Sequence, residues 1–140
     1  MEMGRILAID YGTKRTGIAV TDVLQIIPGG LATVPTHKLF DFLDDYIAKE
    51  PVDTIVVGYP TNMDGTESAS MRYIRQFVER LKRQYPHIKH LMQDERFTSV
   101  LAQRTILEAG IGKMARRNKE LVDEVSAVII LESYLNSVKR

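Results

Sequence analysis

A short apolar run that ends in an acid limits the possible folds of this chain more than any other pattern in its sequence. Residues 4–10 read Gly-Arg-Ile-Leu-Ala-Ile-Asp, so apolar side chains dominate up to Asp10. Such a run is typical of a strand buried on both faces of a sheet, and we expect helices to cover both faces. Residues 16–21 form a second apolar run after a short polar turn. This connection is short enough to require a hairpin, and therefore antiparallel pairing.

The rest of the chain alternates between strands and helices. We expect a third strand over Leu31–Val34 after a turn at Pro28-Gly29-Gly30, and later strands over residues 53–58 and 88–93. Apolar residues three or four apart predict helices over about residues 39–50, 71–81, 98–109 and 119–138, the last two capped by Thr98 and Asn118. The last helix is apolar nearly all round, which predicts that it is buried.

This order indicates a single α/β domain over residues 1–140 with a mixed five-stranded sheet. An antiparallel meander comes first, and the strands that alternate with helices follow in parallel, with helices flanking the sheet. In sheets of this kind, functional residues gather at the carboxyl ends of the parallel strands.

Acidic residues occur at the positions where functional residues are expected, near the carboxyl ends of the strands. Asp10 closes the first strand, Asp94 and Glu95 close the last, and Asp123 and Glu124 lie in the first turns of the final helix. Clustered carboxylates repel one another, and a bound divalent cation removes that cost. Each acid also has a structural interpretation, as a turn acceptor, a solvated strand end or a helix N-terminal acid. Periodicity does not choose between Asp123 and Glu124, although the small Ala127 favours a close approach of Asp123 to the sheet.

The amino-acid composition excludes several kinds of site and several classes of protein. The chain has no cysteine, which excludes a disulfide framework, a thiolate metal site and a cysteine nucleophile. Oxygen ligands favour a hard cation such as Mg²⁺ or Mn²⁺. The net charge of +1 does not by itself indicate a nucleic-acid partner. No segment has the roughly 18 consecutive apolar residues of a membrane span, and charged residues interrupt the N-terminal run where a signal peptide is apolar. We therefore expect a cytoplasmic protein.

Four motifs together resemble the YqgF (RuvX) family of bacterial RNase H-like nucleases, over essentially the whole chain and in the family's order and spacing. They are residues 5–20 (RILAIDYGTKRTGIAV), 55–67 (IVVGYPTNMDGTE), 94–99 (DERFTS) and 122–131 (VDEVSAVIIL). The sequence departs from the family pattern at Tyr59, Thr61, Gln93 and Ser126. None of these departures removes a carboxylate, so they affect the expected shape of the groove and not the expected chemistry.

The resemblance implies an RNase H-like fold and a metal-dependent nuclease that processes the 5′ end of the pre-16S ribosomal RNA. By match to the motifs, Asp10, Glu95 and Asp123 take the catalytic, metal-binding positions. We expect two divalent ions, Mg²⁺ or Mn²⁺, about 4 Å apart, with Asp10 bridging them. One ion would activate the attacking water, and the other would stabilise the leaving oxygen.

Basic and polar residues near these acids are candidates for substrate contacts. They are Thr13, Lys14 and Arg15 after Asp10, Arg96 after Glu95, Lys113, Arg116 and Arg117 before Asp123, and Asn62, which the resemblance places by the groove. Five basic residues and one acid lie between residues 104 and 119. Such clustering is typical of a phosphate-binding surface, although a solvated loop has the same composition. Tyr11 fits either base stacking or internal packing.

Other functions share parts of this pattern. A Holliday junction resolvase requires a dimer that places two sites on two DNA strands, and a non-catalytic RNA-binding module of ribosome assembly would keep the same scaffold. An actin-like ATPase shares the turn after Asp10 but encloses its nucleotide between two domains, and 140 residues provide one. We expect RNA as the main partner, with structured or branched DNA as the alternative, a ribosomal partner for the reaction, and a monomer or weak homodimer.

Overall fold

The computed structural model describes residues 4–59, 69–94 and 119–138, without the side chains of residues 119–122. In chain order its elements are β1 (Arg5–Asp10), β2 (Arg15–Thr21), β3 (Pro28–Pro35), the 3₁₀ helix η1 (Thr36–Lys38), α1 (Leu39–Lys49), β4 (Val52–Tyr59), α2 (Met71–Gln84), β5 (Lys89–Asp94) and α5 (Lys119–Val138). The helix expected over residues 98–109, its cap Thr98 and the cap Asn118 lie outside the described residues.

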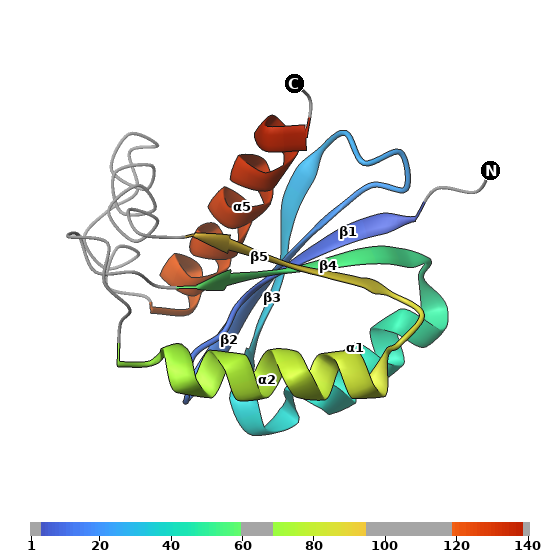
Figure 1. Ribbon diagram of the computed structural model, residues 1–140. Helices are drawn as coiled ribbons and strands as arrows, with labels where there is room; N and C mark the ends of the chain where they lie inside the picture. The colour runs from blue at the N-terminus through green and yellow to red at the C-terminus, as the bar shows by residue number, and fades with distance from the viewer. Residues whose placement is uncertain (1–3, 60–68, 95–118, 139–140) are drawn as a thin grey trace.

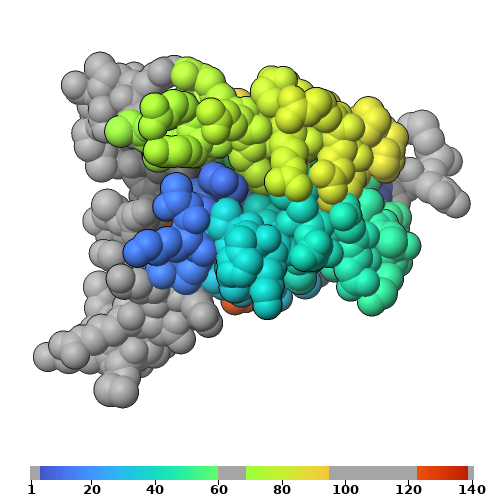
Figure 2. Space-filling model, turned by 90° about the horizontal axis from the view of Figure 1, so that it is seen from below, coloured from blue at the N-terminus to red at the C-terminus, as the bar shows by residue number. Residues whose placement is uncertain are grey.

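The strands form one mixed sheet in the order β3-β2-β1-β4-β5. The first three pair antiparallel, whereas β4 pairs parallel with both β1 and β5. The expected meander followed by parallel strands is therefore confirmed. Helices α1 and α2 cover one face of the sheet and α5 covers the other (Figure 1). Figure 2 shows α1 and α2 lying side by side over their face.

The central strand β1 explains why the sheet needs two helical layers. Leu7 and Ile9 point into the core shared with α1 and α2, whereas Ile6 and Ala8 point into the core shared with α5. All four side chains are at most 3% exposed. Because successive strand residues face opposite sides, the uninterrupted apolar run of β1 buries both of its faces, as the sequence predicts.

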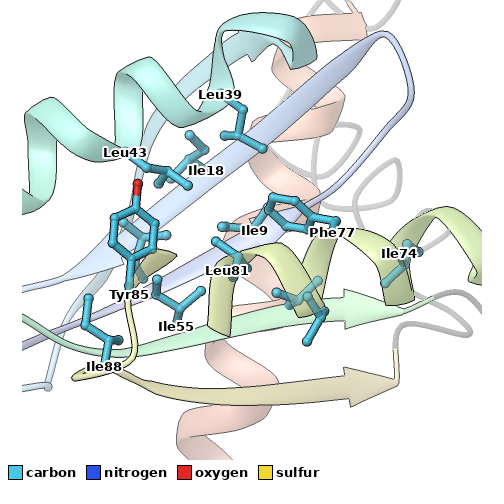
Figure 3. Close-up of a cluster of buried hydrophobic side chains, with 13 residues drawn as sticks. Ile9, Ile18, Leu39, Leu43, Ile55, Ile74, Phe77, Leu81, Tyr85 and Ile88 are labelled. Carbon is cyan, nitrogen blue, oxygen red and sulfur yellow. The ribbon is translucent and has the colours of Figure 1, made fainter. Parts of the chain in front are cut away.

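The core between the sheet and the α1–α2 layer holds the larger side chains (Figure 3). Its fully buried members include Ile9, Ile18, Ile55, Leu39 and Leu81. Truncation of a buried leucine or isoleucine to alanine costs about 2–5 kcal/mol, so this layer supplies much of the stability. Tyr11 stacks on Phe77 of α2 with ring centroids 4.3 Å apart. Internal packing, rather than an open stacking platform, is therefore the role of Tyr11 in this structure.

The core under α5 is built from smaller residues. Ala8 and Ala19 of the sheet and Ala127 of the helix are fully buried, which lets the helix axis approach the sheet closely. The prediction that α5 is buried is confirmed for the face that packs on the sheet and wrong for the helix as a whole. Ala127 and Leu131 are buried, whereas Glu132 and Ser133 are exposed. The buried side chains Ala127, Ile130, Leu131 and Leu135 form the face that packs against the sheet, and this face continues into the second half of the helix.

The expected turn at Pro28-Gly29-Gly30 is also wrong, because all three residues belong to β3 and pair with β2. Strand β3 lies at the edge of the sheet, where a proline without an N–H and flexible glycines are tolerated. A register shift between Ile18 and Ala19 accompanies this pairing.

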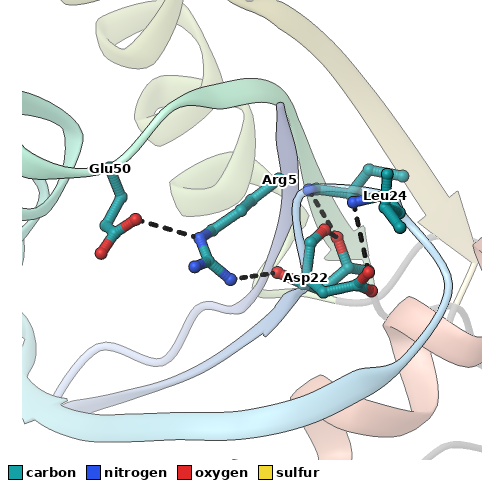
Figure 4. Close-up of polar contacts among 6 residues, drawn as sticks. Arg5, Asp22, Leu24 and Glu50 are labelled. Carbon is teal, nitrogen blue, oxygen red and sulfur yellow. Dashed lines mark hydrogen bonds and ion pairs between the residues drawn. The ribbon is translucent and has the colours of Figure 1, made fainter. Parts of the chain in front are cut away.

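The true turn of this hairpin is organised by Asp22. Its carboxylate accepts hydrogen bonds from the backbone N–H groups of Leu24 (3.2 Å), Ile26 (2.9 Å) and Ile27 (2.8 Å), and the bond from Leu24 can be followed in Figure 4. These donors, led by Ile27, lower the pKa of Asp22. An acid that accepts amides two to five residues onward is a local turn signal, so this turn could have been placed from the sequence.

The carboxyl end of α2 is joined to α1 by a polar contact. The Tyr85 hydroxyl donates to Asp44 Oδ1 at 2.5 Å, and Gln84 Nε2 donates to the same oxygen at 2.9 Å. The bond from Tyr85, followed by that from Gln84, lowers the pKa of Asp44. Burial, reinforced by the bond to Asp44, raises the pKa of Tyr85. This contact fixes the two helices relative to each other over one face of the sheet.

Within the described residues, none of the helices is both long and apolar enough to cross a membrane.

Candidate active site

The candidate site lies where β1 ends. Strands β1 and β4 run parallel, and the pair Ile9 and Val57 is followed by Asp10 at the last position of β1. Ile6 and Ala8 face α5, and residues two apart in a strand share a face. The side chain of Asp10 therefore continues the row of Ile6 and Ala8 onto the face covered by α5. This half-buried carboxylate stands at the carboxyl edge of the sheet, as expected from its place in the sequence.

Gly17 brings helix α5 against this edge. Gly17 is the partner of Asp10 across the β1–β2 pair. A Cβ atom built on Gly17 would lie 2.1 Å from the carbonyl oxygen of Asp123, so only glycine allows the helix backbone to rest there. Neighbouring strands are about 5 Å apart. Asp10 and Asp123 are therefore neighbours across a single glycine, on the same face of the sheet.

The structure separates Asp123 from Glu124, which periodicity leaves as alternatives. A Cβ atom on Gly30 of β3 would lie 2.2 Å from Glu124 Oε1, so the side chain of Glu124 rests over the edge strand. Asp123 instead lies over β2, the direct neighbour of β1. The acid that approaches Asp10 is therefore Asp123. Gly17 and Gly30 were not singled out in the sequence, where only Ala127 indicated a close approach of α5.

Arg15 is the side chain that contacts Asp123 directly. Arg15 Nε donates to Asp123 Oδ2 at 2.9 Å, with the two side chains 37% and 24% exposed. A carboxylate has two oxygens, so an Oδ2 held by the guanidinium leaves Oδ1 as a ligand atom. The sequence suggested Arg15 as a phosphate contact. In the structure Arg15 binds one of the candidate carboxylates.

The turn between β1 and β2 presents Thr13 and Lys14 to solvent. Thr36 anchors this turn from the start of η1: its hydroxyl donates to the Gly12 carbonyl at 2.6 Å, and its N–H donates to the Lys14 carbonyl at 2.9 Å. The turn next to Asp10 therefore has a fixed shape. Sequence reasoning missed Thr36, because nothing in the pattern of residues 35–38 links that segment to a turn more than twenty residues earlier.

Strand β5 shows which face of the sheet Asp94 occupies. Gln93 faces α5, where its Nε2 donates to Ser133 Oγ at 2.9 Å. Asp94 pairs with Tyr59 and, one residue further on, faces the opposite side of the sheet. Asp94 is thus excluded from the face that carries Asp10 and Asp123. The other expected site residues, Glu95, Arg96, Asn62, Lys113, Arg116 and Arg117, lie outside the described residues.

The donor chemistry of the described part of this site fits a hard divalent cation. Asp10 and Asp123 offer carboxylate oxygens, which Mg²⁺ and Mn²⁺ prefer. Within residues 4–59, 69–94 and 119–138, no three His, Asp or Glu side chains come together as a metal site. The described residues therefore include two of the three expected carboxylates, Asp10 and Asp123, and the third, Glu95, lies outside them.

Comparisons with known proteins identify the family of this chain. A model of the RuvX family, described as Holliday junction resolvase, matches residues 4–137. Relatives named "Putative pre-16S rRNA nuclease" include proteins of Porphyromonas gingivalis, 66% identical over 99% of this chain and 100% of their own, and of Phocaeicola vulgatus, 59% identical over 98% of this chain and 99% of their own. A Flavobacterium johnsoniae protein of the same name is 53% identical over 96% of this chain and 98% of its own.

Among solved structures, Pelota from Archaeoglobus fulgidus matches with a TM-score of 0.47 and 12% identity, covering 99% of this chain and 38% of its own. That likeness is too weak to support an argument about function. The family model and the curated relatives, in contrast, span nearly all of the chain. The chain belongs to the RuvX family.

Proposed function

We propose that this chain is a metal-dependent nuclease that hydrolyses phosphodiester bonds of RNA at the carboxyl end of β1. The observation that carries the proposal is the approach of Asp10 and Asp123 across Gly17 on one face of the sheet. Support for the nuclease class comes from the family description, Holliday junction resolvase, and from the names of the relatives. Both descriptions concern enzymes that cut nucleic-acid backbones.

In this proposal Asp10 and Asp123 hold divalent cations, Mg²⁺ or Mn²⁺, through their carboxylate oxygens. Bound there, such ions lower the pKa of a water nucleophile and stabilise the leaving oxygen. Arg15 holds Asp123 Oδ2 and so keeps the second oxygen of Asp123 turned to its ligand position. Thr13 and Lys14, on the turn anchored by Thr36, bind the phosphate next to Asp10.

Glu95 is our proposal for the third carboxylate. Asp94 faces the side away from Asp10, whereas Gln93 faces α5. Glu95 follows Asp94 directly in the sequence, and its place in the motif of residues 94–99 supports this proposal. We propose in addition that Asn62, Arg96, Lys113, Arg116 and Arg117 contact the nucleic-acid backbone around these acids.

The 5′ end of the pre-16S ribosomal RNA is the substrate that we propose, in the cytoplasm, where this RNA is made. The names of relatives that are 53–66% identical over almost their whole length support it. The family description favours a second candidate, the Holliday junction. That reaction needs two sites acting on two strands, and therefore a dimer.

Cleavage of two substrates tests the proposal. Purified protein is incubated with RNA of the precursor's 5′ leader and with a four-way DNA junction, in Mg²⁺ or Mn²⁺ and in chelator. We expect metal-dependent cutting of the RNA and a loss of at least about 100-fold in Asp10→Asn and Asp123→Asn, because each removes a charged ligand. Glu124→Gln and Asp94→Asn are matched controls, since both acids point away from Asp10, and they should cut normally.

Each other outcome has a definite meaning. Cutting of the junction alone would favour resolution over RNA processing. RNA binding without any cutting, unchanged by Asp10→Asn, would refute the nuclease and favour a non-catalytic RNA-binding module.

A further inference from the structure

The exposed side of α2 carries the strongest local charge among the described elements. Its cations are Arg72, Arg75, Arg80, Lys82 and Arg83, all exposed, against the single acid Glu79. Residues 71–84 thus have a net charge of +4 in a chain of +1, so the rest of the chain is net negative by −3. The buried side of the same helix is apolar, so the basic residues are gathered onto the face that meets solvent.

This basic face begins at the edge of the sheet where the parallel strands end, the edge at which Asp10 also stands, although Asp10 faces α5 on the opposite side of the sheet. Phe77 of α2 stacks on Tyr11, the residue that follows Asp10. In Figure 1 the helix starts on the side to which the arrowheads of β4 and β5 point, and it runs back along the sheet. With a rise of 1.5 Å per residue, Arg72 and Arg83 are about 16 Å apart along the helix axis. The cations therefore form a path that leads away from the edge of the sheet at which Asp10 stands.

Three of these cations take part in no ion pair with another residue that the structure describes. Within the described residues the ion pairs join Arg5 to Glu50, Arg15 to Asp123 and Lys49 to Asp45. Arg72, Lys82 and Arg83 take part in none of them. Charges that stabilise only their own helix are expected to pair at a spacing of three or four residues, and Arg83 lies four residues after Glu79 without such a pair.

An exposed aromatic side chain stands at the start of this path. The guanidinium of Arg72 lies over the ring of Tyr73, 4.9 Å from its centroid, and donates to the Tyr73 hydroxyl at 2.9 Å. Tyr73 is 41% exposed. An arginine stacked with an accessible ring is the combination on which unpaired bases of single-stranded nucleic acids stack.

The neighbouring helix has the opposite charge. Asp41, Asp44 and Asp45 of α1 are exposed, and α1 lies beside α2 on the same face of the sheet (Figure 2). The boundary between the helices is closed by the bonds of Gln84 and Tyr85 to Asp44. A polyanion is therefore attracted to α2 and repelled from α1. This contrast favours a strand that runs along α2 over one that crosses to α1.

We propose that the exposed face of α2 holds the phosphate backbone of single-stranded RNA that continues beyond the bond cleaved at Asp10. This inference rests on the proposed nuclease function, because it names where the remainder of its substrate is held. Arg72 and Tyr73 receive the first unpaired base, and Lys82 and Arg83 contact phosphates further along. Neither the acidic patch of α1 nor the sheet offers such a path among the described residues.

Salt dependence of RNA binding tests this inference without requiring cleavage. Binding of a fluorescein-labelled single-stranded RNA is measured by anisotropy at several salt concentrations, with Asp10→Asn as the common background. Each phosphate contact to a single strand contributes about 0.7 to the slope of log K against log salt. The double variant Arg72→Gln/Arg83→Gln should therefore reduce the magnitude of this slope by about 1.4 and weaken binding. Glutamine is a good helix former, and circular dichroism checks that the fold is kept.

The matched control removes two exposed cations from the neighbouring elements, as Lys38→Gln/Lys49→Gln. This control changes the net charge equally and should leave the slope unchanged. An equal fall in both double variants, or an unchanged slope in the α2 variant, would overturn the inference. A fall confined to the α2 variant supports the inference even if the wild-type chain proves not to cut RNA, which would refute the nuclease function alone.

Discussion

At the scale of single residues, the geometry of the site depends on how Asp123 is held. Its partner Arg15 comes from β2, 108 positions earlier in the chain, so the contact joins the turn after β1 to helix α5. Both side chains are partly exposed, and exposed ion pairs contribute only about 0–1 kcal/mol to folding. The contact is thus better suited to orienting a ligand than to stabilising the fold.

Arg15→Gln should separate these two roles. We expect the unfolding free energy to change by less than about 1 kcal/mol, while metal-dependent cleavage falls by about 10–100-fold, the usual effect of removing a group that orients a metal ligand. Urea unfolding and initial cleavage rates measure the two quantities.

Arg5→Gln is the matched control for that variant. Arg5 forms a comparable ion pair, 3.3 Å from Glu50, and donates to the Thr21 carbonyl at the opposite end of β1 (Figure 4). It should lower stability by a similar amount and leave cleavage intact. Equal effects of the two variants on cleavage would show that Arg15 has only a structural role.

At the scale of elements, the approach of α5 to the sheet brings the two acids together. Glycine is required at Gly17 because the helix backbone occupies the space of a side chain. The fully buried Ala8, Ala19 and Ala127 keep the same interface thin further along the helix. Small residues on both sides of this interface therefore position Asp123, in addition to any effect they have on packing.

Gly17→Ala tests that positioning. The new Cβ would clash with the Asp123 carbonyl, which is backbone and cannot simply rotate away. We expect a loss of stability of about 1–3 kcal/mol from overpacking, together with a loss of cleavage in the protein that remains folded at low temperature. Gly29→Ala is the control, because nothing lies within 4 Å of a Cβ built there. Normal cleavage by Gly17→Ala would mean that the position of α5 is not critical.

At the scale of the whole molecule, much of the fold could be predicted because its signals are local. The apolar run of β1 and the short connection to β2 define a doubly covered sheet with an antiparallel start, and the 3.6-residue periodicity of α1 and α2 is clear. The edge strand β3 was misjudged at its beginning, since Pro28 and the glycines that follow usually indicate a turn. The family expected from the four motifs is confirmed by the family match.

The arrangement of the site was less predictable, because it depends on contacts between distant segments. Periodicity alone could not choose between Asp123 and Glu124, because that choice depends on which strand lies beneath each residue. The ion pair of Arg15 likewise joins segments that no local pattern connects. The basic face of α2 had a signal, five cations and one acid over residues 71–84. The apolar positions of that segment already account for it as a helix, so the sequence pattern alone does not single out its cations.

A crystal structure of the chain grown or soaked with Mn²⁺ tests the central claim most directly, because anomalous scattering locates the ion without any assumption about activity. The account predicts a peak between the carboxylates of Asp10 and Asp123, on the face of the sheet covered by α5, that is absent from Asp10→Asn. A peak elsewhere, such as beside Asp94 on the opposite face, or no peak at millimolar Mn²⁺, would contradict the assignment of Asp10 and Asp123 as the metal-binding carboxylates of this RuvX-family chain.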